Sequence, residues 1–421
     1  MMNDFMTQAN TALDTPELQT LADAGVLERL DGVEFSQLTT FHLGGAPRAA
    51  VRAATGEAAA AVVRALDAAG VELLIVGGGS NLLVTDEPLD VVAVIMGDDH
   101  LEIDASTGVL RAGAGAIWDE VVAASIDAGL GGLECLSGIP GSAGATPVQN
   151  VGAYGAEIAD VLTRVQLLDR ATGTVEWVPA SALDLAYRYS NLKFTSRGVV
   201  LAVEFQLRTD GLSAPLRFGQ LAGEPGQRRD PAEVREEVLG LRRSKGMVHD
   251  PADHDTWSAG SFFTNPVVPE TLADEITQVV AAELGADEAA GMPRFPVAAG
   301  SMATEGSDTG GSGTEVSDTE GSGTEVSGGA AGASGGAGNG AAEALVKLSA
   351  AWLIDRAGFA KGYPGADAPA RLSTKHTLAL TNRGAARAAD VVKLARDVRA
   401  GVQEKFGVQL EPEPLWIGLE I

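Results

Sequence analysis

The chain has 421 residues, of which 57 are acidic and 30 basic, and its formal net charge is -27. This length allows two or three domains with cores of their own. The acidic balance argues against nucleic acid as a partner, because binding to a phosphate backbone needs clustered cations. The single cysteine, Cys135, excludes an intramolecular disulfide and a cysteine-based metal cluster, which fits a reducing cytoplasm.

The N-terminal segment predicts neither export nor a membrane anchor. Residues 1–20 mix polar and acidic side chains and lack the basic and apolar regions of a signal peptide. The chain contains no run of about 18 apolar residues, which a membrane span needs. We therefore expect a cytoplasmic monomer without a membrane partner, in which residues 1–35 form a loose extension.

A short apolar run ends abruptly in glycines. The sequence predicts a helix over residues 57–69 and a strand over 71–76, followed by Gly-Gly-Gly-Ser-Asn at 77–81. A strand that ends in a glycine turn can present backbone N–H groups to a phosphate. The segment is no Rossmann fingerprint, because Leu82 replaces the third glycine, and no P-loop, because no Gly-Lys-Ser/Thr follows. A hairpin turn explains it equally well.

A second glycine-rich segment covers residues 138–155. Its glycines and prolines exclude a regular helix or strand, yet Ile139, Val148 and Tyr154 make it too apolar for a solvated loop. Glycines allow backbone N–H groups to approach a phosphate, so we interpret the segment as the wall of a nucleotide site. A tight connection between strands is the alternative.

Short strands and helices surround these two segments, which predicts an α+β unit over residues 36–210. The predicted strands lie within 91–112, 161–168, 174–178 and 201–207, and the predicted helix covers 117–128.

A boundary is expected near residues 211–230, which are rich in glycine, proline and polar residues. Asp230 and Pro231 then open a helix as N-cap and first helical residue. Three cations, Arg242, Arg243 and Lys245, gather at its C-terminal end. They compensate the helix dipole or bind a ligand, and the local sequence favours neither reading.

Ser261 stands among small residues and two phenylalanines in the segment 257–266. A hydroxyl held in such an apolar setting could donate a proton if its alkoxide is stabilised. The nearby His249 and His254 do not have the spacing of one helix face, and we predict no metal site there.

Residues 297–341 are of low complexity and contain a ten-residue repeat, so we predict a disordered insertion without a catalytic role. After it we expect a helix from Glu343 to Gly358, a strand over 377–381 and a helix over 385–406. Glu413 lies between two prolines, where it is either a positioned catalytic acid or a turn residue.

Taken together, seven motifs resemble the UDP-N-acetylenolpyruvoylglucosamine reductase (MurB) family, and they follow the family's order. They are Thr-Thr-Phe-His-Leu-Gly-Gly at 39–45, Gly-Gly-Gly-Ser-Asn at 77–81, Gly-Ile-Pro-Gly-Ser at 138–142 with Gln-Asn-Val-Gly-Ala-Tyr-Gly at 149–155, Tyr-Arg-Tyr-Ser at 187–190, Gly-Ser-Phe-Phe-Thr-Asn-Pro at 260–266, Leu-Ser-Thr-Lys-His at 372–376 and Leu-Glu-Pro-Glu at 410–413.

The resemblance implies an α+β fold with a vanillyl-alcohol-oxidase (PCMH)-type FAD-binding unit over 36–210, in two subdomains (36–88 and 89–210). A substrate-binding α+β domain over 211–421 would follow. Bound FAD, reduced by NADPH, would reduce UDP-N-acetylglucosamine enolpyruvate to UDP-N-acetylmuramate in peptidoglycan precursor synthesis. The alternatives are a flavin oxidase of the same fold acting on a sugar or alcohol, and a binding module without catalysis.

The resemblance also assigns roles to residues. The catalytic ones are Arg188, Ser261 and Glu413, with Arg188 and Glu413 polarising and stabilising the intermediate, Glu413 in its protonated form, and Ser261 delivering a proton. The cofactor-binding ones are Gly77, Gly78, Gly79, Ser80, Asn81, Leu82, Gly138, Ile139, Pro140, Gly141, Ser142, Gln149, Asn150, Gly152, Ala153 and Tyr154, and the substrate-binding ones are Tyr187, Phe218, Lys245 and Asn265. Phe218 departs from the family's loop tyrosine, so the loop closes less tightly or relies on Arg217.

Overall fold

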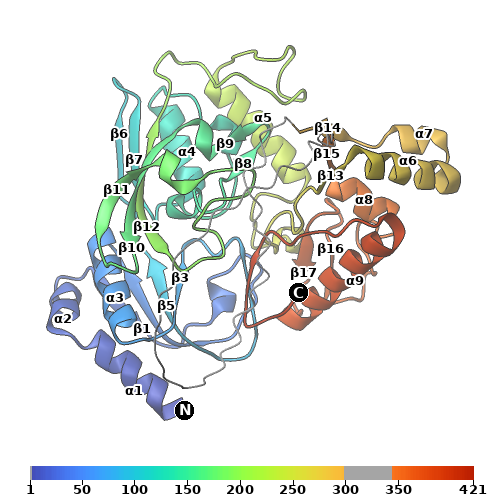
Figure 1. The fold of residues 1–421 in the computed structure, drawn as a ribbon. Helices are drawn as coiled ribbons and strands as arrows, with labels where there is room; N and C mark the ends of the chain where they lie inside the picture. Colours follow the sequence, from blue (N-terminus) through green and yellow to red (C-terminus); the bar gives the residue numbers. More distant parts are fainter. Residues whose placement is uncertain (1, 298–343) are drawn as a thin grey trace, which may run out of the picture.

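The computed structural model describes residues 2–297 and 344–421, and its elements form three parts (Figure 1). The predicted insertion at 297–341 lies, apart from residue 297, outside the described residues. In the described ranges, no helix is long and apolar enough to cross a membrane.

The first part is a four-stranded sheet with the strand order β1-β2-β5-β3. Its strands are β1 (Leu27–Leu30), β2 (Pro47–Ala53), β3 (Leu73–Val76) and β5 (Leu89–Met96). Strands β2 and β3 both run parallel to β5, with Ala50 and Leu74 each opposite Ala93. Helix α3 (Gly56–Ala68) buries its alanines and valines against this sheet. It confirms the helix predicted over residues 57–69.

The expected loose extension over residues 1–35 is wrong. The segment forms helices α1 (Met2–Leu13) and α2 (Pro16–Asp23), and strand β1 pairs antiparallel with β2. Leu13 and Leu18 are buried in the same core as α3. The polar composition of the segment conceals these few apolar positions, whose burial depends on a partner from elsewhere in the chain.

The second part is a five-stranded antiparallel sheet with the order β11-β10-β12-β7-β6. Its strands are β6 (Leu101–Asp104), β7 (Val109–Gly113), β10 (Leu162–Asp169), β11 (Val175–Pro179) and β12 (Gly198–Gln206). Helix α4 (Trp118–Asp127) covers it, and Trp118 is fully buried beside Phe205 with ring centroids 5.8 Å apart. The predicted strands and helix of this part are confirmed.

Helix α5 (Pro231–Ser244) leads to the third part. Asp230 caps it as predicted, because its carboxylate accepts hydrogen bonds from the N–H groups of Ala232 and Glu233.

Small strands complete the first two parts. Strand β4 (Leu82–Val84) lies near the first sheet, and the hairpin of β8 (Gly152–Ala153) and β9 (Ala156–Glu157) lies near the second.

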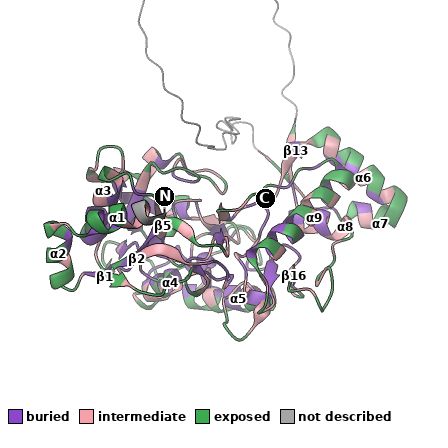
Figure 2. Cartoon of the chain, turned by 90° about the horizontal axis from the view of Figure 1, so that it is seen from below, coloured by how far each residue is buried: buried purple, intermediate pink, exposed green. Residues whose placement is uncertain are grey.

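Among the described residues, the third part combines a small sheet, a hairpin and four helices around one core. The sheet contains β13 (Val267–Pro269), β15 (Leu345–Leu348) and β14 (Arg294–Pro296), and the hairpin contains β16 (Ala370–Leu372) and β17 (Leu380–Asn382). The helices are α6 (Glu270–Leu284), α7 (Ala286–Ala290), α8 (Ala350–Arg356) and α9 (Ala388–Phe406). Helices α6 and α7 are largely exposed, whereas α9 turns a buried stripe to the core (Figure 2).

The helix predicted from Glu343 to Gly358 is wrong in its first half. Val346 and Leu348 alternate with less buried residues in β15, between β13 and β14. Helix α8 begins only after Ser349, whose hydroxyl accepts a hydrogen bond from the N–H of Trp352. A run of apolar residues does not distinguish a strand from a helix by itself, and here the cap decides where the helix starts.

The C-terminal end of the chain returns to the first part. Strand β18 (Leu415–Ile417) pairs in parallel with β4, so that Leu415 lies opposite Leu82. Phe41, Leu43 and Leu83 are buried in the core of the third part. These contacts bring residues more than 300 positions apart into one region, which is where the main cavity lies.

Candidate active site

A cavity of about 600 Å³ lies where the three parts meet. Its wall includes the two glycine-rich segments, the loop 192–196 after Arg188, the segment 256–261 and Glu413. Sequence segments that are far apart therefore form one site, and most of the predicted functional residues lie on its wall.

The two glycine-rich loops pack backbone against backbone at this wall. A Cβ atom added to Gly78 would lie 2.6 Å from the Cα of Gly141, and one added to Gly141 would lie 2.7 Å from the hydroxyl of Ser80. Gly79 has a φ of +58°, and a Cβ there would overlap the carbonyl oxygen of Leu38. Only glycine fits these close approaches. The glycines of the first loop are therefore required for packing against the second loop, and not only for a hairpin turn.

Several buried polar atoms on the wall have no hydrogen-bond partner in the described part of the chain. They are the hydroxyl of Ser142, Nε of Arg242 and Nδ1 of His249. Buried polar groups are rarely left unsatisfied in folded proteins, so these atoms are available for a bound ligand. Burial lowers the pKa of Arg242 to about 10, which leaves the guanidinium charged near neutral pH.

The charge of the wall fits an anionic ligand. Its basic side chains are Arg170, Arg188, Lys193 and Arg242, whereas Glu413 is the acidic one among the described residues. Arg170 is already paired with Asp67. In a chain whose net charge is -27, this local excess of cations is what a dinucleotide with a diphosphate needs. The residues present therefore fit FAD.

Replacing Gly79 by alanine is expected to weaken FAD binding by about 10- to 100-fold, because the new methyl group displaces the loop and the αL backbone is strained. The measurement is a titration of the apoprotein with FAD. Gly70→Ala is the matched control, since Gly70 also has a positive φ of +63° but no heavy atom within 4 Å of its added Cβ. Equal affinities of the two variants would contradict the role of the first loop.

Arg188 and Glu413 form an ion pair at the cavity. The Nε of Arg188 lies 3.3 Å from Oε1 of Glu413, and the two side chains are 21% and 13% exposed. Arg188 also donates a hydrogen bond of 2.6 Å from Nη2 to the carbonyl oxygen of Gly152. Its φ of +55° is uncommon for a residue other than glycine and is typical of functional sites.

Backbone pairing places Glu413 next to the segment of Ser261. The N–H of Glu413 donates to the carbonyl oxygen of Phe262 at 2.8 Å, and Phe263 bridges to Pro412. On the other side, the amide of Asn81 donates to Gln149 at 2.9 Å and to the carbonyl oxygen of Glu413 at 3.4 Å. The glycine-rich loops and the segment that carries Glu413 are thus fixed to each other.

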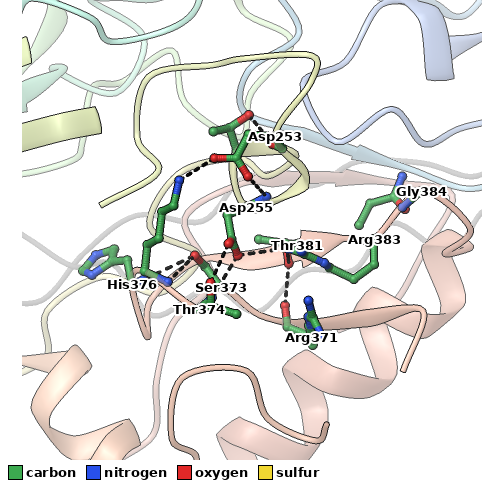
Figure 3. A network of polar contacts seen from close by, with 12 residues as sticks. Asp253, Asp255, Arg371, Ser373, Thr374, His376, Thr381, Arg383 and Gly384 are labelled. Atoms are coloured by element: carbon green, nitrogen blue, oxygen red, sulfur yellow. Dashed lines mark hydrogen bonds and ion pairs between the residues drawn. The ribbon is translucent and has the colours of Figure 1, made fainter. Parts of the chain in front are cut away.

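Ser261 lies on the same wall, and the described residues offer its hydroxyl no hydrogen-bond partner. The segment before it is held by the polar network in Figure 3. In that network Asp255 accepts hydrogen bonds from the N–H and hydroxyl of Thr374 and from Nη1 of Arg383, all at 2.6–2.9 Å. Lys375 pairs with Asp253. The network fixes the turn that carries the segment 256–261.

Replacing Asp255 by asparagine is expected to lower the free energy of unfolding by about 2 kcal/mol at neutral pH, because Arg383 loses its partner. Burial raises the pKa of Asp255, but the hydrogen bonds from Thr374 and the charge of Arg383 outweigh it and hold that pKa below its ordinary 3.8. The contribution is therefore present above about pH 4 and lost as the pH falls further. Denaturant unfolding of both proteins at neutral pH and near pH 3 checks this, and a constant difference would contradict it.

Most predicted site residues line the cavity. They are Gly77, Gly78, Gly79, Ser80, Asn81, Leu82, Ile139, Pro140, Gly141, Ser142, Gln149, Gly152, Arg188, Ser261 and Glu413. The remaining eight are not part of this wall, namely Gly138, Asn150, Ala153, Tyr154, Tyr187, Phe218, Lys245 and Asn265. The roles predicted for all of these residues, on the wall and off it, stay predictions.

The residues off the wall have other contacts. Gly138 donates its N–H to Asp119 at 2.6 Å, and the buried Asn150 bonds to Glu157. Phe218 packs edge-on against Tyr154 with ring centroids 5.3 Å apart. These contacts fix the second glycine-rich segment through residues that do not line the cavity.

The predicted substrate residues split into two places. Tyr187 lies near Asn265, whose Oδ1 accepts a hydrogen bond from the N–H of Ala350, and Nζ of Lys347 lies 4.3 Å from the Tyr187 ring centroid. Lys245 lies near His376, where burial and then the charge of Lys245 lower the pKa of the histidine to about 4.

The wall also contains basic residues to which the sequence assigned no site role, among them Lys193, whereas Arg242 was left open between dipole compensation and ligand binding. Arg242 continues the buried stripe of Val234 and Val238 at helical spacing, a signal that could have separated it from Arg243. Lys193 had no such signal, because nothing in the sequence shows that an isolated lysine in a loop becomes buried. No group of three or more His, Cys, Asp or Glu residues able to hold a metal ion occurs in 2–297 or 344–421.

The fold and the cavity define an FAD-dependent oxidoreductase with a two-subdomain FAD-binding unit. An FAD binding domain model matches residues 47–179, and the model of the UDP-N-acetylenolpyruvoylglucosamine reductase C-terminal domain matches residues 250–417. The chain belongs to the UDP-N-acetylenolpyruvoylglucosamine reductase family, as its similarity to curated members establishes.

Curated relatives match over nearly the whole chain. A UDP-N-acetylenolpyruvoylglucosamine reductase of Corynebacterium glutamicum (strain R) is 55% identical over 416 residues, which cover 97% of this chain and 99% of that protein. One of Mycolicibacterium gilvum (strain PYR-GCK) is 47% identical over 395 residues, 93% of this chain and 97% of the relative. The crystal structure of the Thermus caldophilus reductase has the same fold, with a TM-score of 0.55 at 23% identity, covering 93% of this chain and 98% of that one.

Proposed function

We propose that this protein reduces UDP-N-acetylglucosamine enolpyruvate to UDP-N-acetylmuramate in peptidoglycan precursor synthesis, with bound FAD and with NADPH as the reductant. The observation that carries the proposal is the Arg188–Glu413 pair, which lies with Ser261 on the same cavity wall as the two glycine-rich loops. Relatives over 50% identical that match almost end to end are named as this reductase, which supports the same conclusion.

The chemistry that the site must support is the addition of a hydride and a proton across a carbon–carbon double bond. When bound, FAD supplies the hydride to the carbon β to the substrate's carboxylate. Negative charge then builds on that carboxylate and the α carbon, so a fixed cation must face it. Arg188 provides this cation, because its guanidinium is held by both Glu413 and the carbonyl of Gly152.

A proton on the α carbon completes the reaction, and we assign its delivery to the hydroxyl of Ser261. A proton donor must be within hydrogen-bond reach of the atom that accepts the proton. The Ser261 hydroxyl is free to turn toward the cavity, since it has no partner among the described residues. Glu413 is on the adjacent backbone segment, where it polarises the same end of the substrate together with Arg188.

We assign the diphosphate of the substrate to Lys245 and Asn265, and we assign Tyr187 to the substrate site as well. Tyr187 directly precedes Arg188 and Lys245 directly precedes Gly246, and both of these neighbours line the cavity. Phe218 lacks a hydroxyl and packs on Tyr154, so the neighbouring Arg217 is the polar group available on this loop. Arg217 lies 3.6 Å from Asp160 and is 64% exposed, so it can turn toward a phosphate.

The function is tested by anaerobic turnover with the purified protein. NADPH is expected to be oxidised beyond one equivalent per flavin only when the enolpyruvyl nucleotide is present, and UDP-N-acetylmuramate is identified as the product by mass spectrometry. A sugar or alcohol oxidase of the same fold would instead consume oxygen with alcohols and would not need a proton donor such as Ser261. Oxygen consumption with an alcohol, in the absence of nucleotide turnover, would refute the proposal.

A further inference from the structure

Lys193 is a buried cation on the cavity wall to which neither the sequence nor the proposed mechanism gives a role. It is 8% exposed and lies five residues after Arg188 in the loop that lines the cavity. Its Nζ donates a hydrogen bond of 3.2 Å to the carbonyl oxygen of Arg188. Burying a lysine is costly unless its charge is matched, so a partner is required.

The ammonium group is only partly satisfied. Lysine carries three N–H donors, and within the described ranges the Arg188 carbonyl is the only acceptor that Nζ contacts. The ring of Phe194 lies 5.0 Å away and offers a weak cation–π contact. The remaining donors have no acceptor in the described structure, on a wall that faces the ligand cavity.

The charged groups around the Lys193 ammonium include more bases than acids. Burial lowers the pKa of Lys193, the charge of Glu413 raises it, and that of Arg188 lowers it. The cluster thus contains two cations, Arg188 and Lys193, and one acid, Glu413. The two cations outnumber the acid, and a carboxylate entering the cavity would pair with the cation in excess.

We propose that Lys193 binds the carboxylate of the substrate's enolpyruvyl group together with Arg188, as the second cation of a carboxylate site. The inference rests on the proposed function, because that function supplies the carboxylate. Arg188 contacts the carboxylate from its guanidinium, and Lys193 contacts it from an ammonium anchored on the Arg188 backbone. Since the same carboxylate gains charge during hydride addition, both cations act where charge develops.

A purely structural role predicts something different. In that case Lys193 would serve to hold Arg188 in its αL conformation through the carbonyl contact. Loss of Lys193 would then affect all ligands and the stability of the loop, without preference for a ligand that carries a carboxylate. A pair of ligands that differ in this one group therefore separates the two roles.

The test compares the binding of UDP-N-acetylmuramate, which carries the carboxylate, and UDP-N-acetylglucosamine, which lacks it, to the oxidised flavoprotein by calorimetry. Lys193→Gln keeps a donor for the Arg188 carbonyl but removes the charge. We expect its affinity for UDP-N-acetylmuramate to fall by about 10- to 100-fold, and its affinity for UDP-N-acetylglucosamine to change by less than about twofold. Equal changes for both nucleotides, or none, would overturn the proposal.

Two further variants complete the design. Lys393→Gln is the matched control, because Lys393 pairs with Asp397 on the surface and should leave both affinities unchanged. If Lys193→Gln loses flavin, Lys193→Arg takes its place, since it keeps the charge but moves the donors. A change selective for UDP-N-acetylmuramate supports the carboxylate role, and an equal change for both nucleotides contradicts it. Turnover by the unmodified protein checks the underlying function separately.

Discussion

Replacing Ser261 by alanine is expected to slow the reoxidation of reduced flavin by the enolpyruvyl nucleotide by about 10²- to 10⁴-fold. Flavin reduction by NADPH should proceed at the unmodified rate, because only the second half-reaction needs a proton on the α carbon. The hydroxyl lies on the cavity wall next to the segment of Glu413, and none of the described residues is hydrogen-bonded to it. Anaerobic stopped-flow absorbance of the flavin measures both half-reactions separately.

Two control variants accompany Ser261→Ala. Ser261→Cys retains a proton donor and should recover part of the lost rate. Ser244→Ala removes an exposed hydroxyl that bonds to the carbonyl of Leu241, and it should leave both half-reactions unchanged. An equal loss in both half-reactions of Ser261→Ala would show that the hydroxyl shapes the site rather than donates the proton.

Replacing Glu413 by glutamine should slow reduction of the nucleotide by about 10²- to 10³-fold, with FAD binding intact. The substitution keeps the size of the side chain and an oxygen for Arg188, but it removes the carboxyl group whose Oε1 lies 3.3 Å from the guanidinium. The backbone contacts of Glu413 with Phe262 and Asn81 do not involve the carboxylate and should persist. Stopped-flow reoxidation and the product yield measure the effect.

The neighbouring Glu411 supplies the control for this prediction. Glu411 lies in the same extended segment, but its carboxylate is 63% exposed and 3.7 Å from Arg399, away from the cavity. Glu411→Gln should therefore react at the unmodified rate. If Glu413→Gln behaves like Glu411→Gln, the carboxylate of Glu413 has no part in the reaction and its position is only structural.

The glycine-rich loops are the part of the site that the sequence predicted best. Their composition is a local property, and so is the requirement of a close backbone approach at Gly78 and Gly141. The Asp230 cap was predicted for the same reason. The meeting of Arg188 and Glu413, in contrast, depends on the pairing of β18 with β4 across more than 300 residues. Only the family resemblance brought these two together in advance.

The errors have one physical cause, which is that burial depends on tertiary contacts. The N-terminal helices bury Leu13 and Leu18 against α3, although the surrounding sequence is polar. The strand Leu345–Leu348 has an apolar pattern that also suits a helix. Its pairing with β13 and β14 determines that it forms a strand. Lys193 gives no local sign of its burial.

The most direct test of the account is an anaerobic double-mixing experiment on the purified flavoprotein. NADPH first bleaches the flavin, and UDP-N-acetylglucosamine enolpyruvate is then added without oxygen. The account predicts that the flavin absorbance returns fully and that one UDP-N-acetylmuramate forms per flavin reoxidised. A protein that contains no flavin, or a reduced flavin that reoxidises only when oxygen is admitted, would contradict it.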